Sequence, residues 1–210
     1  MANMCSNKYA FFTTDENKDE LKRLHQNLSA IIGPPNAPKD YDAGWLGNIA
    51  IWHNINRDNF SCRGYTGHLD DYDPDSNFFT LETETAWSPT TELWEAVIAL
   101  YDGVSFVFIA EEPGSQIYTN TDIKGTYFCD RYLLEIYGDI PIPAGWFPGG
   151  DKPDCLDIRE YFDCFDTLRD YCADFTGKEL SALEEMQSYF NGLFDEDSNV
   201  IVGVHEFTPD

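Results

Sequence analysis

The chain has 210 residues, of which 42% are hydrophobic and 15% are aromatic, and its formal net charge at pH 7 is −25. So many aromatic residues can supply a hydrophobic core, which excludes a disordered acidic tail. The strong negative charge repels nucleic acid and anionic membranes, so we expect a basic protein partner and neither direct nucleic-acid binding nor membrane binding.

The N-terminal part of the chain predicts a strand followed by a helix. Residues 5–14 are rich in strand-forming residues, and residues 13–32 repeat leucine and isoleucine at helical spacing. Thr13 and Glu16 have the spacing of a capping box, and Gly33 followed by two prolines ends the helix. Residues 45–55 are apolar and fit either a short helix or a strand.

An acidic stretch precedes the next predicted strand. Five residues fall at positions 1, 3, 5, 7 and 12 of a calcium-binding loop: Asp71, Asp73, Asp75, Asn77 and Glu82. Ser76 occupies the position at which that loop needs glycine, and the alternation of Phe79 and Leu81 with polar residues predicts a strand after the loop, not a helix. We therefore expect a hairpin turn, and a divalent-metal site at these five residues is the alternative.

A helix follows this strand, and residues typical of helix starts and ends mark both of its ends. Ser88 is suited to the N-cap, Pro89 to the first helical position, and Gly103 ends the pattern. Two further strands are predicted over residues 104–114 and 125–138, the second in a hairpin with residues 116–121. The order of elements predicts the α+β class and a ferredoxin-like α/β sandwich with an antiparallel sheet.

The domain organisation follows from proline, glycine and charge. We expect a ferredoxin-like domain over residues 1–140, a linker rich in proline and glycine over residues 141–153, and an acidic helical C-terminal extension over residues 154–210. Residues 141–210 contain 16 acidic and four basic residues. Ser181 and Glu184 predict a capping box for the second helix of the extension.

Four short segments, "MANMCSNKYAF", "GWLGNI", "TAWSPTTELWEAV" and "FVFIAEEPGS", occur in this order over residues 1–137. Together they resemble the YubB ferredoxin-like family of bacterial proteins encoded by plasmids and mobile elements. The resemblance implies a ferredoxin-like core without an iron–sulfur cluster. It implies no catalytic residues and no cofactor, so we predict none of either, and it places Trp87 in the core beside a helix.

The segment from residue 154 to residue 175 predicts one amphipathic helix whose acidic side is our candidate partner-binding surface. On such a helix, successive acidic residues stand roughly 4.5–6 Å apart along the axis, which is comparable with the roughly 3.4 Å between phosphates of one DNA strand. An ordinary solvated face is the alternative. The acidic residues are Asp157, Glu160, Asp163, Asp166, Asp170 and Asp174.

These observations favour a non-catalytic acidic binding protein. We expect an inhibitor of the phage or plasmid type that mimics nucleic acid and occupies the basic surface of a nucleic-acid-binding protein. One alternative is a divalent-metal-dependent enzyme or calcium-binding protein that uses the Asp71 loop. Another is a structural or assembly module whose acidity serves only solubility.

The N-terminal sequence and the cysteines bear on the compartment. The segment "MANMCSNKYAFFTTDENK" lacks the basic and apolar regions of an export signal, and the longest apolar runs are too short to span a bilayer. We therefore expect a cytoplasmic protein. In a reducing cytoplasm the six cysteines should be free thiols.

Overall fold

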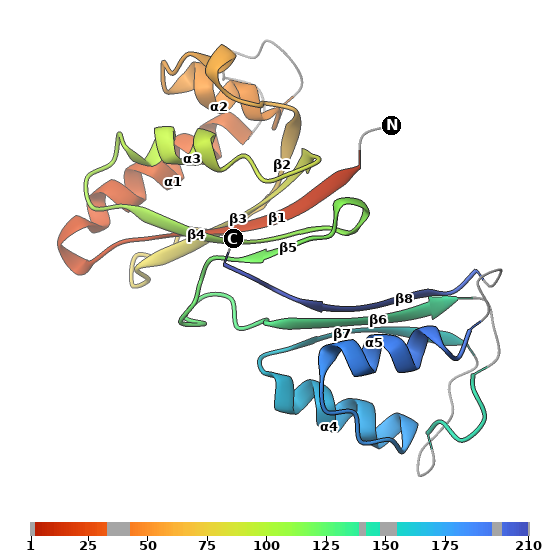
Figure 1. Cartoon of the computed structure of the whole chain (residues 1–210). Coiled ribbons are helices and arrows are strands. Elements are labelled where there is room, and N and C mark those ends of the chain that lie inside the picture. Colours follow the sequence, from red (N-terminus) through yellow and green to blue (C-terminus); the bar gives the residue numbers. More distant parts are fainter. Residues whose placement is uncertain (1–2, 33–42, 139–141, 148–154, 195–198, 210) are drawn as a thin grey trace. The chain divides into compact units, whose positions relative to one another are not determined.

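The computed structural model describes residues 3–32, 43–138, 142–147, 155–194 and 199–209 (Figure 1). The chain divides into two compact units, Met1–Asp122 and Ile123–Pro209, which we call the N-terminal unit and the C-terminal unit. The expected domain boundary at residue 140 is therefore too late. The reason is that residues 132–138 pair with strands of the C-terminal unit.

The N-terminal unit is built on a five-stranded antiparallel sheet with the order β2-β3-β1-β4-β5. Tyr9 at the centre of the sheet stands opposite Leu81 on one neighbouring strand and Phe108 on the other. The strands are β1 (Met4–Phe12), β2 (Gly64–Leu69), β3 (Phe78–Ala86), β4 (Ser105–Glu112) and β5 (Ile117–Asn120).

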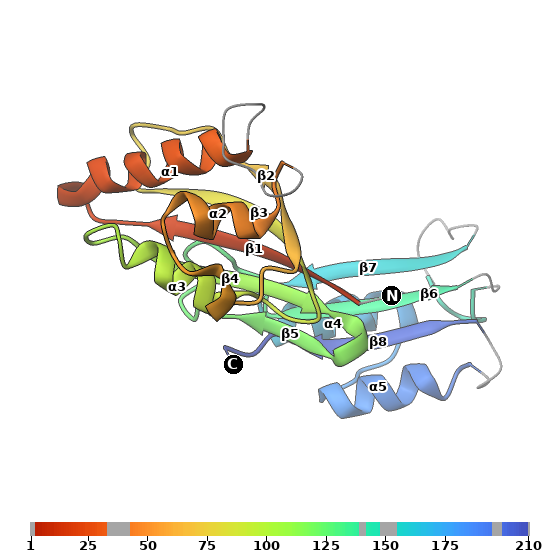
Figure 2. The same cartoon turned by 90° about the horizontal axis from the view of Figure 1, so that it is seen from above.

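Three helices lie on one face of this sheet (Figures 1 and 2). Side chains alternate along a strand, so Tyr9 and Phe11 point to the same face, where they meet Trp94 of α3 at ring-centroid distances of 5.2 Å. All three side chains are fully buried, and each such aromatic contributes about 1.5–3 kcal/mol of transfer free energy. The helices are α1 (Lys18–Ile32), α2 (Leu46–Trp52) and α3 (Thr91–Ile98). Short 3-10 turns precede α1, follow α2 and follow β4; they are η1 (Asp15–Asn17), η2 (Arg57–Asn59) and η3 (Pro113–Ser115).

The start of α3 differs from the prediction. The helix begins at Thr91 with Thr90 at the N-cap, and not after an N-cap at Ser88. Trp87 has a left-handed backbone, with φ at 75°, and the Ser88 carbonyl accepts a hydrogen bond of 2.7 Å from the Thr85 hydroxyl. The chain therefore makes an irregular turn before the helix. The Trp87 side chain is 47% exposed, so its expected place in the core is wrong.

The C-terminal unit has a three-stranded antiparallel sheet with the order β7-β6-β8. Its two helices lie on one face of the sheet (Figure 1), and Leu134 and Ile136 of the central strand pack with Phe175 and Phe190 of the helices. The elements are β6 (Tyr132–Gly138), β7 (Leu156–Phe162), α4 (Phe165–Thr176), α5 (Leu183–Asn191) and β8 (Ile201–Glu206).

The prediction of a continuous helix over residues 154–175 is wrong. Buried Leu156 and Ile158 alternate with exposed Asp157 and Arg159, which is the period of a strand, and this segment pairs with β6 along its whole length. The helix starts only at Phe165. The expected helical extension is therefore a β-α-α-β segment that completes a sheet with β6.

Two other predictions also change in this part of the chain. β6 does not form a hairpin with residues 116–121, because β5 pairs with β4 and β6 pairs with β7 and β8. The expected linker over residues 141–153 contributes Ile142 and Trp146 to the core of the C-terminal unit, and its residues 141 and 148–153 lie outside the described residues.

The α+β class is confirmed, with helices and two antiparallel sheets in one chain. In the part of the chain that the structure describes, no helix combines the length and the apolar character needed to cross a membrane.

Candidate functional site

The five residues of the calcium-loop pattern lie in and after the connection from β2 to β3. The Asp73 carboxylate accepts a hydrogen bond of 2.9 Å from the Asp75 backbone N–H, and the Glu82 carboxylate on β3 lies 3.3 Å from the Lys8 ammonium. The expected hairpin connection is confirmed. Among the described residues, the structure brings no three acidic, histidine or cysteine side chains together as metal ligands, so Asp71 joins no such group.

His53 of the second helical segment takes part in a chain of hydrogen bonds. Its Nδ1–H donates to the Ile49 carbonyl at 2.8 Å, and its Nε2 accepts from the Tyr101 hydroxyl at 2.7 Å. The same hydroxyl accepts from the Asn27 amide at 2.7 Å. Burial lowers the pKa of His53, so the ring is held neutral in a structural role.

The six acidic residues predicted to bind a partner do not form one row. Asp157 and Glu160 lie on β7, where an odd separation places them on opposite faces of the sheet. Asp163 lies in the turn before α4. The other three, Asp166, Asp170 and Asp174, are exposed on α4. The spacing that resembled DNA phosphates required a single helix, so it does not occur.

Three of the acidic residues have local contacts within the chain. The Asp163 carboxylate accepts a hydrogen bond of 2.9 Å from the Thr167 hydroxyl, which lowers the pKa of this carboxyl group. Arg169 contacts Asp166 at 2.7 Å and Asp170 at 3.0 Å. These exposed pairs partly neutralise α4 but contribute little to stability.

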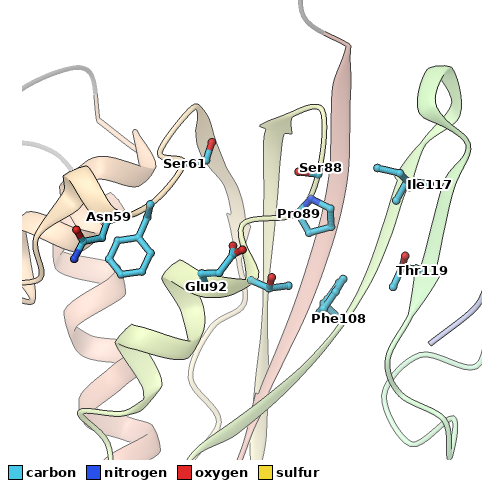
Figure 3. A pocket seen from close by; sticks show the side chains of 10 residues that line it. Asn59, Ser61, Ser88, Pro89, Glu92, Phe108, Ile117 and Thr119 are labelled. Atoms are coloured by element: carbon cyan, nitrogen blue, oxygen red, sulfur yellow. The ribbon is translucent and has the colours of Figure 1, made fainter. Parts of the chain in front are cut away.

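A hollow of about 550 Å³ in the N-terminal unit was not predicted from the sequence (Figure 3). We call it the Glu92 hollow. It lies within the range of about 300–1,000 Å³ that is typical of ligand pockets. It is lined by Asn59, Phe60, Ser61, Ser88, Pro89, Thr91, Glu92, Phe108, Ile117 and Thr119.

The strand register explains one side of the Glu92 hollow. Thr119 of β5 stands opposite Ala110 of β4, so Phe108, Ile117 and Thr119 point to the same face of the sheet as the helices. The irregular turn at Ser88 and Pro89 provides another wall. Figure 3 shows Glu92 between Asn59 and the turn that carries Pro89.

A buried polar network supports this turn. The Asn7 amide donates to the Thr85 hydroxyl at 2.9 Å, and that hydroxyl donates to the Ser88 carbonyl at 2.7 Å. The Trp87 backbone N–H also donates to the Asn3 carbonyl at 3.0 Å. The wall of the Glu92 hollow is therefore tied to β1, at the centre of the sheet.

Glu92 is the one charged side chain among the lining residues of the Glu92 hollow. It is exposed, and within the described ranges its carboxylate has no ion pair and no hydrogen bond. The other polar lining groups are hydroxyls and one amide. This set can hold a cation by charge, an aromatic face and hydroxyl oxygens; among the described residues that line the hollow there is no histidine, cysteine or lysine.

The comparisons with known proteins give no family. No family model matches the chain, and neither a curated protein nor a solved structure matches it.

Proposed function

We propose that this chain is a non-catalytic binding protein that engages a basic, nucleic-acid-binding protein, in the manner of a phage or plasmid inhibitor that mimics nucleic acid. The observation that carries the proposal is the charge of the C-terminal unit, whose residues 123–209 include 18 acidic and six basic residues. A field of this kind speeds association with a basic surface and is screened by salt.

The exposed carboxylates support this proposal individually. Asp157, Glu160 and Asp174 are exposed, and within the described residues none of them forms an ion pair or a hydrogen bond. Unpaired carboxylates keep their full charge available to a partner. The proposed mimicry of nucleic acid therefore rests on charge density, and not on a phosphate-like spacing along one helix.

The fold and the compartment are part of the same proposal. A ferredoxin-like sandwich in the N-terminal unit is supported by β1 lying between β3 and β4, with the helices on one face. The resemblance to the YubB family supports an origin in a mobile element. A cytoplasmic location is supported by the six cysteines, which are all free thiols.

A displacement experiment tests the proposed function. Purified basic DNA-binding proteins, each loaded with a fluorescein-labelled DNA duplex, are titrated with the chain at low salt. We expect at least one of them to release its duplex, with the effect suppressed at high salt, because exposed charges are screened beyond about 8–10 Å at physiological ionic strength. Polyglutamate at equal total charge is the control.

The result of the displacement experiment is judged against the polyglutamate control. Displacement at chain concentrations well below those that polyglutamate requires supports a specific partner. If no protein of the panel releases its duplex, or if polyglutamate is equally effective, acidity serves only solubility and the proposal is wrong.

A further inference from the structure

We infer that the Glu92 hollow receives an arginine side chain of the basic partner. The inference rests on the proposed function and adds to it an anchoring site in the N-terminal unit, outside the acidic residues of the C-terminal unit. Net charge alone does not say which residues contact the partner, and the inference names one such contact.

Charge complementarity is the first argument. The Glu92 carboxylate is exposed, has no partner in the described part of the chain, and is the single charge among the lining residues. The positive end of the α3 dipole accounts for an acidic residue in the first turn of a helix. It does not account for the hollow into which this carboxylate projects (Figure 3).

The walls of the Glu92 hollow fit arginine better than lysine. Phe60 is partly exposed and offers an aromatic face on which a planar guanidinium group can stack, while Phe108 is only 6% exposed and adds apolar surface. The hydroxyls of Ser61, Thr91 and Thr119 can accept its N–H groups, of which arginine has five and a lysine ammonium three. Pro89 and Ile117 add apolar surface for the methylene stem.

The site is also preorganised. The hydrogen bonds from Thr85 to Ser88 and from Trp87 to Asn3 hold the turn that forms one wall. Trp87 keeps a left-handed backbone that costs an ordinary residue free energy, which the surrounding structure must offset. A fixed wall reduces the entropy lost when a side chain enters.

Two fluorescein-labelled peptides test the inference: one with four arginines separated by Gly-Ser, and the same peptide with lysines. Binding to the full chain is measured by fluorescence anisotropy at low salt, for the wild type, Glu92→Gln and the matched control Glu95→Gln. Glu95 lies on the same helix and is also exposed, but it does not line the hollow. We expect Glu92→Gln to weaken arginine-peptide binding roughly threefold to fivefold, the range of one exposed ion pair, and Glu95→Gln by less than about 1.5-fold.

The two possible failures are distinguishable. Equal effects of Glu92→Gln and Glu95→Gln, or equal affinity of the wild type for both peptides, would overturn the inference, while salt-sensitive binding would leave the proposed function standing. If the wild type binds neither peptide at low salt, the inference fails together with the proposed function. A larger loss for Glu92→Gln, seen with arginine and reduced with lysine, supports it.

Discussion

Trp87 has a backbone conformation that is unfavourable for its residue type. A tryptophan with φ at 75° occupies a conformation that favours glycine, and its ring is 47% exposed, so burial does not compensate for the strain. Three backbone and side-chain hydrogen bonds fix the turn around it: Ala86 N–H to Arg63, Trp87 N–H to Asn3, and Thr85 to Ser88. A strained exposed aromatic beside a hollow is typical of a functional surface.

Two replacements of Trp87 distinguish the free-energy cost of its backbone conformation from the contribution of its side-chain contacts. We expect Trp87→Gly to be more stable than Trp87→Ala by about 1 kcal/mol, because both remove the ring and only glycine adopts the left-handed backbone without cost. Urea unfolding curves of the two variants give this difference. An alanine variant as stable as the glycine variant would show that the turn is not strained at this position.

His53 gives a prediction for pH. Burial lowers its pKa below the ordinary value of 6.5, so the unfolded chain binds the proton more readily than the folded chain. The stabilisation from neutral His53 is therefore complete above pH 6.5 and is lost as the pH falls below that value.

NMR titration of the His53 imidazole measures this directly, and the midpoint should lie below 6.5. In His53→Gln the decrease in stability between neutral and mildly acidic pH should be smaller than in the wild type. A His53 midpoint at or above 6.5 would contradict the burial of the ring and its hydrogen-bond chain with Tyr101.

At the scale of elements, one charged group links the three strands of the C-terminal unit. Glu135 of β6 has a side chain only 4% exposed, and it pairs with Arg159 of β7 and lies 3.7 Å from the His205 imidazole of β8. The close approach of His205 depends on Gly203, because a Cβ at that position would overlap the imidazole. The sheet thus buries the Glu135 carboxylate, whose charge is compensated by groups on the two neighbouring strands.

The variant Arg159→Met should destabilise the protein by about 3 kcal/mol, since it leaves the buried Glu135 carboxylate without its arginine. The double variant Glu135→Gln with Arg159→Met should recover most of this loss, because no buried charge remains. Thermal unfolding of both variants and the wild type tests the prediction. Equal destabilisation in the single and double variants would show that Arg159 acts through packing alone.

The elements that sequence predicts well are those with one clear period. Strand β3 alternates as expected, with Phe79, Leu81 and Thr83 buried and Glu82 exposed. The segment from residue 155 fails because a short strand and a helix follow each other, and their apolar residues together imitate one helical stripe. The N-cap of α4 is Cys164, which makes no side-chain capping hydrogen bond, so no capping residue in the sequence marks the start of this helix.

The two predicted capping boxes also differ from the structure. The Thr13 hydroxyl donates to the Gly103 carbonyl at 2.8 Å, a contact between segments far apart in the chain that no local pattern can reveal. The Ser181 hydroxyl donates to Glu185, one residue beyond the expected Glu184. The Glu92 hollow was missed because it is formed by strand register and by an irregular turn, and neither leaves a periodic signal in the sequence.

At the scale of the whole molecule, negative charge is carried by both units. Residues 123–209 contain 18 acidic residues, and two arginines of this unit pair with three of them, Glu135, Asp166 and Asp170. Self-repulsion of such charge costs stability. We propose that partner binding is the reason why the chain tolerates that cost, since solubility alone requires a smaller net charge.

The association rate constant with a basic protein whose DNA this chain displaces tests the central claim most directly. It is measured by stopped flow at low and at physiological salt for two triple variants with equal charge change. One carries Asp157→Asn, Glu160→Gln and Asp174→Asn in the C-terminal unit, and its control carries Asp19→Asn, Glu84→Gln and Glu95→Gln in the N-terminal unit. We predict that the first variant associates roughly threefold to tenfold more slowly than the wild type at low salt and that the control is little changed. Equal rates for the two variants would contradict a specific role for the acidic surface of the C-terminal unit.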